Sequence, residues 1–193
     1  MARPREFNDT AALEAAIACF WNHGYEATSV RDLAENMGLS PPSLYNAYGD
    51  KHALFVQALE HYLNRSMRER IERLENTLPP KAAICEFIGE IIDHSATDRE
   101  RRGCFLVNSA LEVAPHDKKL GGLIADRIAE LEAFFIRSIR KAQTEKTVSR
   151  KRAAKDLARL LLGVVLGIRV LARVRPDRAF LESLARPALA LLD

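Results

Sequence analysis

The chain offers one candidate nucleophile. Cys104 stands at the start of a predicted short helix and directly follows the basic residues Arg99, Arg101 and Arg102. Positive charge and a helix N-terminus both stabilise a reactive thiolate. Cys104 is therefore a candidate sensor of oxidants or electrophiles. The alternative is that it packs as a small apolar residue beside Phe105, as free cysteines usually do.

Other chemistry-bearing side chains do not form a recognisable catalytic or metal-binding pattern. His94, Glu112, His116 and Asp117 lie near the same short helix, but their spacing matches no known metal motif. No nucleophile–base pairing or phosphate-binding loop is visible. The three cysteines are widely spaced, which fits a reduced cytoplasmic setting better than a disulfide framework. We therefore expect no enzyme, no metal and no cofactor.

The elements that organise the N-terminal region are two short helices joined by a tight turn. Thr28 or Ser29 can cap the first helix, because a hydroxyl accepts a hydrogen bond from an otherwise unpaired backbone N–H. Gly38 supplies the left-handed residue that ends it. The second helix begins with a cap and two prolines, at Ser40, Pro41 and Pro42. This arrangement predicts a helix-turn-helix, whose second helix enters the major groove of DNA.

Short motifs follow one another in order along the first quarter of the chain. They are Ala15-Ala16-Ile17, Phe20, Gly24-Tyr25, Thr28-Ser29-Val30, Leu33-Ala34, Gly38-Leu39-Ser40, Ser43-Leu44-Tyr45, Tyr48-Gly49-Asp50-Lys51 and Leu54-Phe55. Together they resemble the DNA-binding domain of the TetR family of bacterial transcriptional regulators. The remainder of the chain agrees with that family only in its length and helical character.

The resemblance implies a recognition helix from Ser40 to Ala47 and a set of DNA contacts around it. Bases would be read by Pro42, Ser43, Tyr45 and Asn46, since Asn can pair with adenine through two hydrogen bonds. Phosphates or the minor groove would be contacted by the flanking residues Arg3, Arg5, Thr28, Ser29, Ser40, Pro41, Tyr45, Tyr48 and Lys51. The alternatives are that Tyr45 and Tyr48 only pack, and that Asn46 only caps the helix.

Charge does not by itself identify a DNA-binding protein here. The formal net charge of the whole chain is +3. Residues 1–51 hold four basic side chains against seven acidic ones, which departs from the usual basic footprint. The basic groups stand in the N-terminal arm and at helix ends, however, and helix N-termini and hydroxyls bind phosphate without a formal charge.

The rest of the chain predicts a second, wholly helical unit. Asp50 caps a long helix that reaches about Thr77, with its second half, from Arg65 to Glu75, alternating in charge and expected to be solvated. Further helices follow to the C-terminus, and Pro187 is expected to interrupt the last one. The most apolar run is too short to span a bilayer, so no membrane partner is expected.

The last two helices are apolar on more than one face, which predicts burial against a second copy of the chain. The expected dimer contacts are Leu157, Leu161, Val164, Val165, Ile168, Leu181 and Leu184. An effector cavity could be lined by Cys104, Asn108, Leu111 and Glu112, whose alternative role is ordinary packing or surface exposure.

These observations predict an all-α protein of about nine helices. Residues 1–50 would form a three-helix helix-turn-helix domain, and residues 51–193 a helical domain for dimerisation and effector binding. The expected function is a cytoplasmic, homodimeric repressor of a palindromic operator in double-stranded DNA, released by a small-molecule or thiol-reactive effector. The alternative is a helical interaction protein that keeps the fold without binding DNA.

Overall fold

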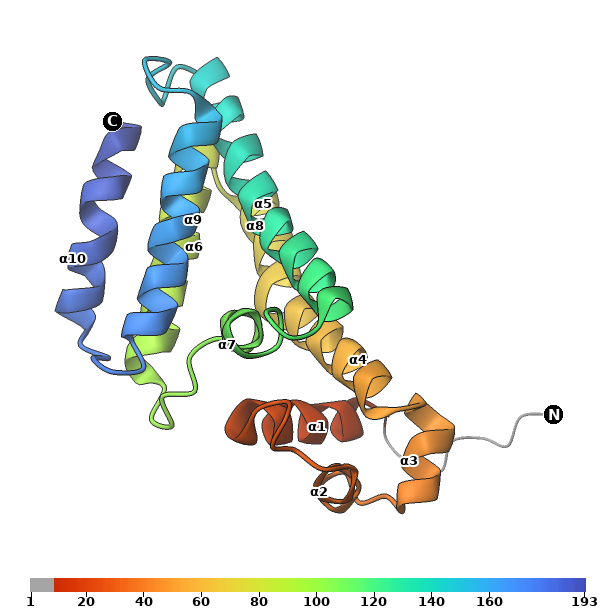
Figure 1. The fold of residues 1–193 in the computed structure, drawn as a ribbon. Helices are drawn as coiled ribbons and strands as arrows, with labels where there is room; N and C mark the ends of the chain where they lie inside the picture. Colours follow the sequence, from red (N-terminus) through yellow and green to blue (C-terminus); the bar gives the residue numbers. More distant parts are fainter. Residues whose placement is uncertain (1–8) are drawn as a thin grey trace.

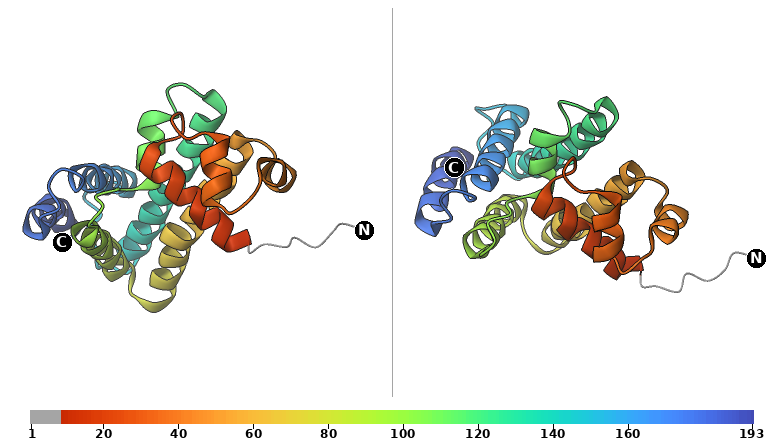
Figure 2. Two further views of the ribbon diagram at one scale, coloured as in Figure 1. Left: turned by 90° about the horizontal axis from the view of Figure 1, so that it is seen from below. Right: turned by 60° about the horizontal axis from the view of Figure 1, so that its bottom comes forward.

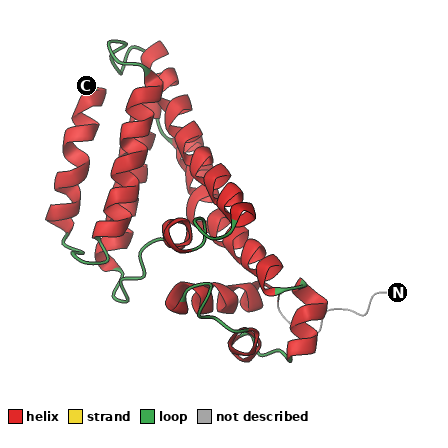
Figure 3. Ribbon diagram, in the orientation of Figure 1, coloured by secondary structure: helices red, strands yellow, loops and turns green. Residues whose placement is uncertain are grey.

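The computed structural model describes residues 9–193, and every regular element within that range is a helix (Figures 1 and 3). The helices are α1 (Asp9–His23), α2 (Val30–Asn36), α3 (Pro41–Tyr48), α4 (Lys51–Leu63), α5 (Glu69–Thr77), α6 (Pro80–Thr97), α7 (Phe105–Glu112), α8 (Lys118–Thr144), α9 (Ala154–Leu171) and α10 (Arg178–Leu189). A π-helical turn, η1 (Asn64–Arg68), joins α4 to α5, and a 3₁₀ turn, η2 (Ala190–Leu192), follows α10. With α4, η1 and α5 counted as one continuous helix, the prediction of about nine helices is confirmed for the described residues.

The first three helices gather at one end of the molecule, where α1 and α3 pack on α4 and α2 packs on α1 and α3 (Figures 1 and 2). Their contact is aromatic: the Phe20 ring meets Phe55 of α4 edge-on at 5.2 Å between centroids, and Tyr25 meets the same ring at 4.9 Å. Such edge-to-face pairs stabilise a core beyond the area they bury. The small helices are therefore anchored to the start of the long helix.

The long helix from α4 to α5 is less solvated than its charge pattern suggested. Met67, Ile71 and Leu74 are buried in its second half. The helix also contains one π-helical turn at η1, a feature that is found frequently at functional sites. The expectation of a solvated second half is therefore wrong on the face that packs against α6.

The C-terminal part is a layered bundle in which α8, α9, α10 and α6 pack against one another (Figure 1). Its core is built around Phe87, Phe134 and Phe135, all almost fully buried. The last helix runs through Pro187 to Leu189 rather than stopping there. Pro187 lies in the final turn of the helix, where it removes one backbone hydrogen bond. No helix within residues 9–193 is long and apolar enough to cross a membrane.

Candidate functional site

The turn between α2 and α3 is closed by two backbone hydrogen bonds that require a left-handed residue. Gly38 has φ of +66°, its N–H donates to the Glu35 carbonyl at 3.1 Å, and the Leu39 N–H donates to the Ala34 carbonyl at 2.8 Å. This pair of bonds is the Schellman ending of a helix. It fixes the direction in which the chain leaves α2 and so sets the orientation of α3.

Both short helices have the caps that the sequence predicted. Ser29 and Asp32 form a reciprocal capping box at the start of α2, with each side chain accepting from the other residue's backbone N–H. Hydrogen bonds from the Ser29 side chain and backbone hold the pKa of Asp32 below its usual range. The Ser40 hydroxyl accepts from the Ser43 N–H at 3.3 Å at the start of α3.

Helix α3 presents a polar face to solvent, and two residues on its opposite face are buried in the core. Leu44 is fully buried and Tyr48 is 3% exposed. The exposed residues are the ones predicted to meet DNA: Ser40, Pro41, Pro42, Ser43, Tyr45 and Asn46. Tyr45 is half-exposed and prominent among them. The structure therefore brings together, on one outward face, most of the predicted reading residues.

Two of the predicted contacts need correction because their hydroxyls are used inside the fold. The Tyr48 hydroxyl donates to Asp9 Oδ1 at 2.6 Å and ties α3 to the start of α1. The Thr28 hydroxyl donates to the Gly24 carbonyl at 2.6 Å, and Thr28 is 1% exposed. Neither side chain is available to a phosphate, because each is buried against its own partner.

Lys51, another predicted phosphate ligand, lies at the edge of the three-helix unit. Lys51, at the first position of α4, has its ammonium 4.4 Å from the centre of the Tyr25 ring and donates to the Glu26 carbonyl at 3.4 Å. These contacts leave further donors of the ammonium group free for an anion. Arg3 and Arg5 lie outside the described residues.

The predicted effector residues do not form one site. Asn108, Leu111 and Glu112 line a cleft of about 370 Å³ between α1 and α7, but Cys104 does not line it. Glu112 accepts from the Glu26 N–H at 3.2 Å, and Asn108 donates to the Arg102 carbonyl at 2.9 Å. These two side chains therefore act as ties between neighbouring segments.

Cys104 is the N-cap residue of α7 and contacts Tyr62 of α4. Its sulfur accepts a hydrogen bond from the Tyr62 hydroxyl at 3.6 Å, and its side chain is partly buried. Burial and the neighbouring Cys104 raise the pKa of Tyr62 above its usual range. The packing role that the sequence left open as the alternative fits this position. Among residues 9–193 no group of three His, Cys, Asp or Glu side chains is arranged to hold a metal ion.

The predicted dimer contacts mostly face the inside of a single chain. Five of them are at most 3% exposed within the protomer and so cannot meet a partner: Leu157, Leu161, Val165, Ile168 and Leu181. Val164 and Leu184 are partly buried. The error arose because α9 is apolar nearly all round, and hydrophobicity alone does not say which stripe faces α6, α8 and α10.

A different stripe of α9 is exposed. It is defined by Leu160, Gly163, Gly167 and Val170 of α9, which recur at helical spacing, together with Val174 in the turn that follows the helix; Gly167 is half-buried, the other four are exposed, and Val174 is 76% exposed. A Cβ atom added at either glycine would meet nothing within 4 Å. We call these five residues the α9 stripe.

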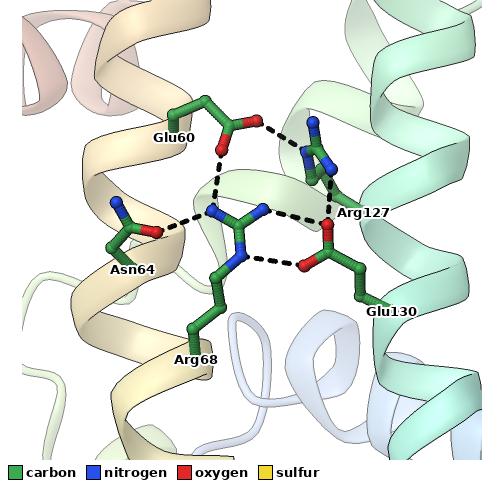
Figure 4. Close-up of polar contacts among 5 residues, drawn as sticks. All are labelled: Glu60, Asn64, Arg68, Arg127 and Glu130. Atoms are coloured by element: carbon green, nitrogen blue, oxygen red, sulfur yellow. Dashed lines mark hydrogen bonds and ion pairs between the residues drawn. The ribbon is translucent and has the colours of Figure 1, made fainter.

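One polar cluster that sequence reasoning missed joins the long helix to α8 (Figure 4). Arg68 of η1 donates to Glu130 through two nitrogens, both at 2.9 Å, to Glu60 at 2.8 Å and to Asn64 at 2.6 Å. Arg127 of α8 pairs with Glu60 at 2.6 Å and also with Glu130. The pairing spans distant parts of the sequence, so no local spacing could have predicted it.

The comparisons with known proteins agree with this geometry. The family model for bacterial regulatory proteins of the tetR family matches residues 12–58, and a tetracycline-repressor-like C-terminal domain model matches residues 80–187. An uncharacterised HTH-type transcriptional regulator, YezE of Bacillus subtilis, is 31% identical over the full length of both chains. The HTH-type transcriptional repressor ComR of Escherichia coli is 27% identical over 96% of this chain and 88% of its own.

A solved structure matches the whole fold. It is a cysteine-substituted form of the regulator CifR complexed with 26-bp double-stranded operator DNA, 30% identical, with a TM-score of 0.88 over 99% of this chain and all of that one. The helix-turn-helix, the helical C-terminal part and these relatives lead to one conclusion. The chain belongs to the tetR family of bacterial regulatory proteins and is a helix-turn-helix transcriptional regulator.

Proposed function

We propose that this protein represses transcription in the cytoplasm as a homodimer on an approximately palindromic operator, without catalysing a reaction. The observation that carries the proposal is the polar, outward face of α3, held by Leu44 and Tyr48 beneath it. Two such faces related by a two-fold axis would meet two half-sites of one duplex. A structurally similar regulator, CifR, has been solved with operator DNA.

We divide the proposed DNA contacts by the chemistry of each side chain. Asn46 and Ser43 would contact base edges, with Pro42 against a thymine methyl group. Tyr45 and Lys51 would contact phosphates, together with the N-terminus of α2 at Ser29. The division at residue 50 would then separate the reading unit from the dimerisation and effector unit.

Dimerisation would use the α9 stripe with the neighbouring face of α10. Exposed apolar patches of this kind mark interaction sites, and the two glycines would let a partner backbone approach closely. A small-molecule effector would release the DNA by binding better to a conformation in which the two reading helices no longer fit one duplex.

The test begins with selection of bound fragments from random DNA by the full-length protein, which reports operator and symmetry together. Binding to the selected operator is then measured against salt for the wild type, Lys51→Ala and Asn46→Ala. Lys51→Ala removes one phosphate contact from each protomer, so it should weaken all sequences about equally and flatten the slope of log affinity on log salt by about 1.8 for the bound dimer, which is about 0.9 per contact. Asn46→Ala should cost roughly 1–3 kcal/mol per half-site on the preferred base and relax specificity there.

A matched control removes a charge far from α3. Lys141 is exposed near the end of α8, at the opposite end of the molecule in Figure 1, so Lys141→Ala should change neither the slope nor the specificity. Failure of the wild type to select any sequence, or an effect of Lys141→Ala equal to that of Lys51→Ala, would refute the proposed interface.

A further inference from the structure

A cavity of about 540 Å³ lies between α1, the η1 turn, α5, α6 and α9. Its volume is in the range of sites that hold small molecules. Apolar lining comes from α1 and α4, including Trp21 and Tyr62, and cationic lining comes from Arg65, Arg70, Arg102 and Arg169. Among the residues that the structure describes, two carboxylates line it, Glu14 and Glu69. The cavity thus combines an apolar wall with an excess of positive charge.

Arg169 is the exceptional member of this lining. Three of the arginines have carboxylate partners: Arg65 pairs with Glu14, Arg70 with Glu90 and Arg102 with Glu100. Arg169 has no ion pair within the described residues. Its Nη1 donates to the Ser95 hydroxyl, at 3.3 Å.

Arg169 is also only 6% exposed, and among the described residues it is the one buried side chain of the charged types Asp, Glu, Lys and Arg. A buried charge without a counter-charge is costly to a folded protein. A bound anion would supply the missing counter-charge.

The titration of neighbouring groups reflects the same positive potential. Burial and the charge of Arg169 lower the pKa of Arg70, although Glu90 lies beside it. Burial and the charges of Arg169 and Arg70 lower the pKa of His94, which also lines the cavity. Added positive charge is therefore disfavoured here, and an anion would be favoured.

We propose that this cavity binds a small organic anion whose carboxylate or phosphate group pairs with Arg169. The planar guanidinium can hold such a group through two hydrogen bonds. The apolar part of the ligand would lie against Trp21 and Tyr62. The proposal rests on the proposed function in one respect: the anion is the effector that the regulator senses.

The position of the cavity lets a bound anion affect the DNA-binding helices. Helix α1 forms one wall, and the η1 turn forms another through Arg65 and Ser66. Glu14 of α1 pairs with Arg65 and with His61, so an anion near Arg65 competes with Glu14 for the same cation. Weakening that contact loosens α1 from the long helix and changes the placement of α3.

Trp21 provides a direct measurement because it is the only tryptophan in the chain and it lines the cavity. Its fluorescence is followed in the full-length protein, without DNA, during titration with sodium benzoate, sodium phosphate and neutral benzamide at constant ionic strength. We expect a saturable change with benzoate, with phosphate or with both, and none with benzamide. Which of the two anions binds distinguishes a carboxylate ligand from a phosphate ligand.

The variants test whether Arg169 is the partner. Arg169→Gln should weaken anion binding roughly tenfold or more, as loss of a charge-assisted pair does. Arg65→Gln, a change at an exposed position with little risk to folding, should weaken it by a smaller factor. Arg137→Gln removes an exposed arginine that pairs with Glu75 outside the cavity and should leave binding unchanged.

The outcomes separate this proposal from the repressor function. Failure of both anions to bind, equal binding of benzamide, or unchanged binding in Arg169→Gln would overturn it, even if the wild type binds its operator normally. Anion binding by a protein that selects no operator would instead overturn the proposed function. With both intact, benzoate or phosphate should release the wild type from its operator and leave Arg169→Gln bound.

Discussion

We predict that Arg68→Met lowers the free energy of unfolding by about 1–2 kcal/mol. Arg68 lies in the η1 turn and is the centre of the cluster in Figure 4, where it donates four hydrogen bonds to Glu60, Asn64 and Glu130. Methionine keeps most of the unbranched side-chain volume and removes the charge. The change therefore isolates the polar link between the long helix and α8.

The magnitude follows from burial and geometry. The Arg68, Glu60 and Glu130 side chains are 29–33% exposed, so water screens the ion pairs only in part. A charge-assisted, two-pronged pair of this kind is worth roughly 1.5–3 kcal/mol when shielded and about 0–1 kcal/mol when exposed. Arg127 stays paired with both glutamates, which limits the loss. For a chain of this length, the expected fall in melting temperature is about 2–8 °C.

The assay is chemical denaturation at fixed protomer concentration, because the stability of a dimer depends on concentration. A double-mutant cycle with Glu130→Gln should give a coupling energy of at least about 0.5 kcal/mol. Arg137→Met is the matched control: it removes an exposed pair with Glu75 that also joins α8 to the long helix, and it should cost under about 1 kcal/mol. Equal losses in Arg68→Met and Arg137→Met, or a coupling energy near zero, would refute the reasoning.

Two further predictions concern the α9 stripe and acid stability. Val170→Glu places a charge on the α9 stripe and should weaken dimerisation at least about tenfold, as measured by sedimentation. Leu111→Glu, at an exposed leucine of α7, is the control and should leave dimerisation unchanged. A dimer unaffected by Val170→Glu would exclude the α9 stripe as the dimer interface. Hydrogen bonds from Arg68 hold the pKa of Glu130 below its usual range, so this carboxylate contributes stability above its unfolded pKa of about 4.3 and loses it as the pH falls through the lower folded value. The stability difference between wild type and Arg68→Met should therefore be full near neutral pH and shrink in acid below about pH 4.5; a difference independent of pH would contradict it.

The sequence predicted the fold well where local chemistry decides the structure. Caps at Ser29, Ser40 and Asp50 set the starts of three helices, and Gly38 set the turn, because hydrogen bonds within a few residues determine each of these features. The outward face of α3 also followed from spacing, since Leu44 occupies the buried position of a short amphipathic helix.

The features that sequence could not predict depend on contacts between distant segments. Nothing near Tyr48 in the chain says that its hydroxyl meets Asp9 across 39 residues. An apolar helix such as α9 could present several stripes, and only the packing of α6, α8 and α10 selects the exposed one. Arg169 interrupts an apolar run, which was a signal, but its lack of a carboxylate partner among residues 9–193 became visible only with the fold assembled.

The aromatic contact of α1 with α4 has a consequence for protein engineering. To exchange operator preference between two relatives, one could join residues 1–50 of one protein to the C-terminal part of the other, with the junction at the cap of α4. That cut would separate Phe20 and Tyr25 from their own Phe55 and pair them with a foreign ring. A graft that carries its native α4 through Leu63 keeps this joint intact, so the transferable module is longer than the segment that touches the double helix.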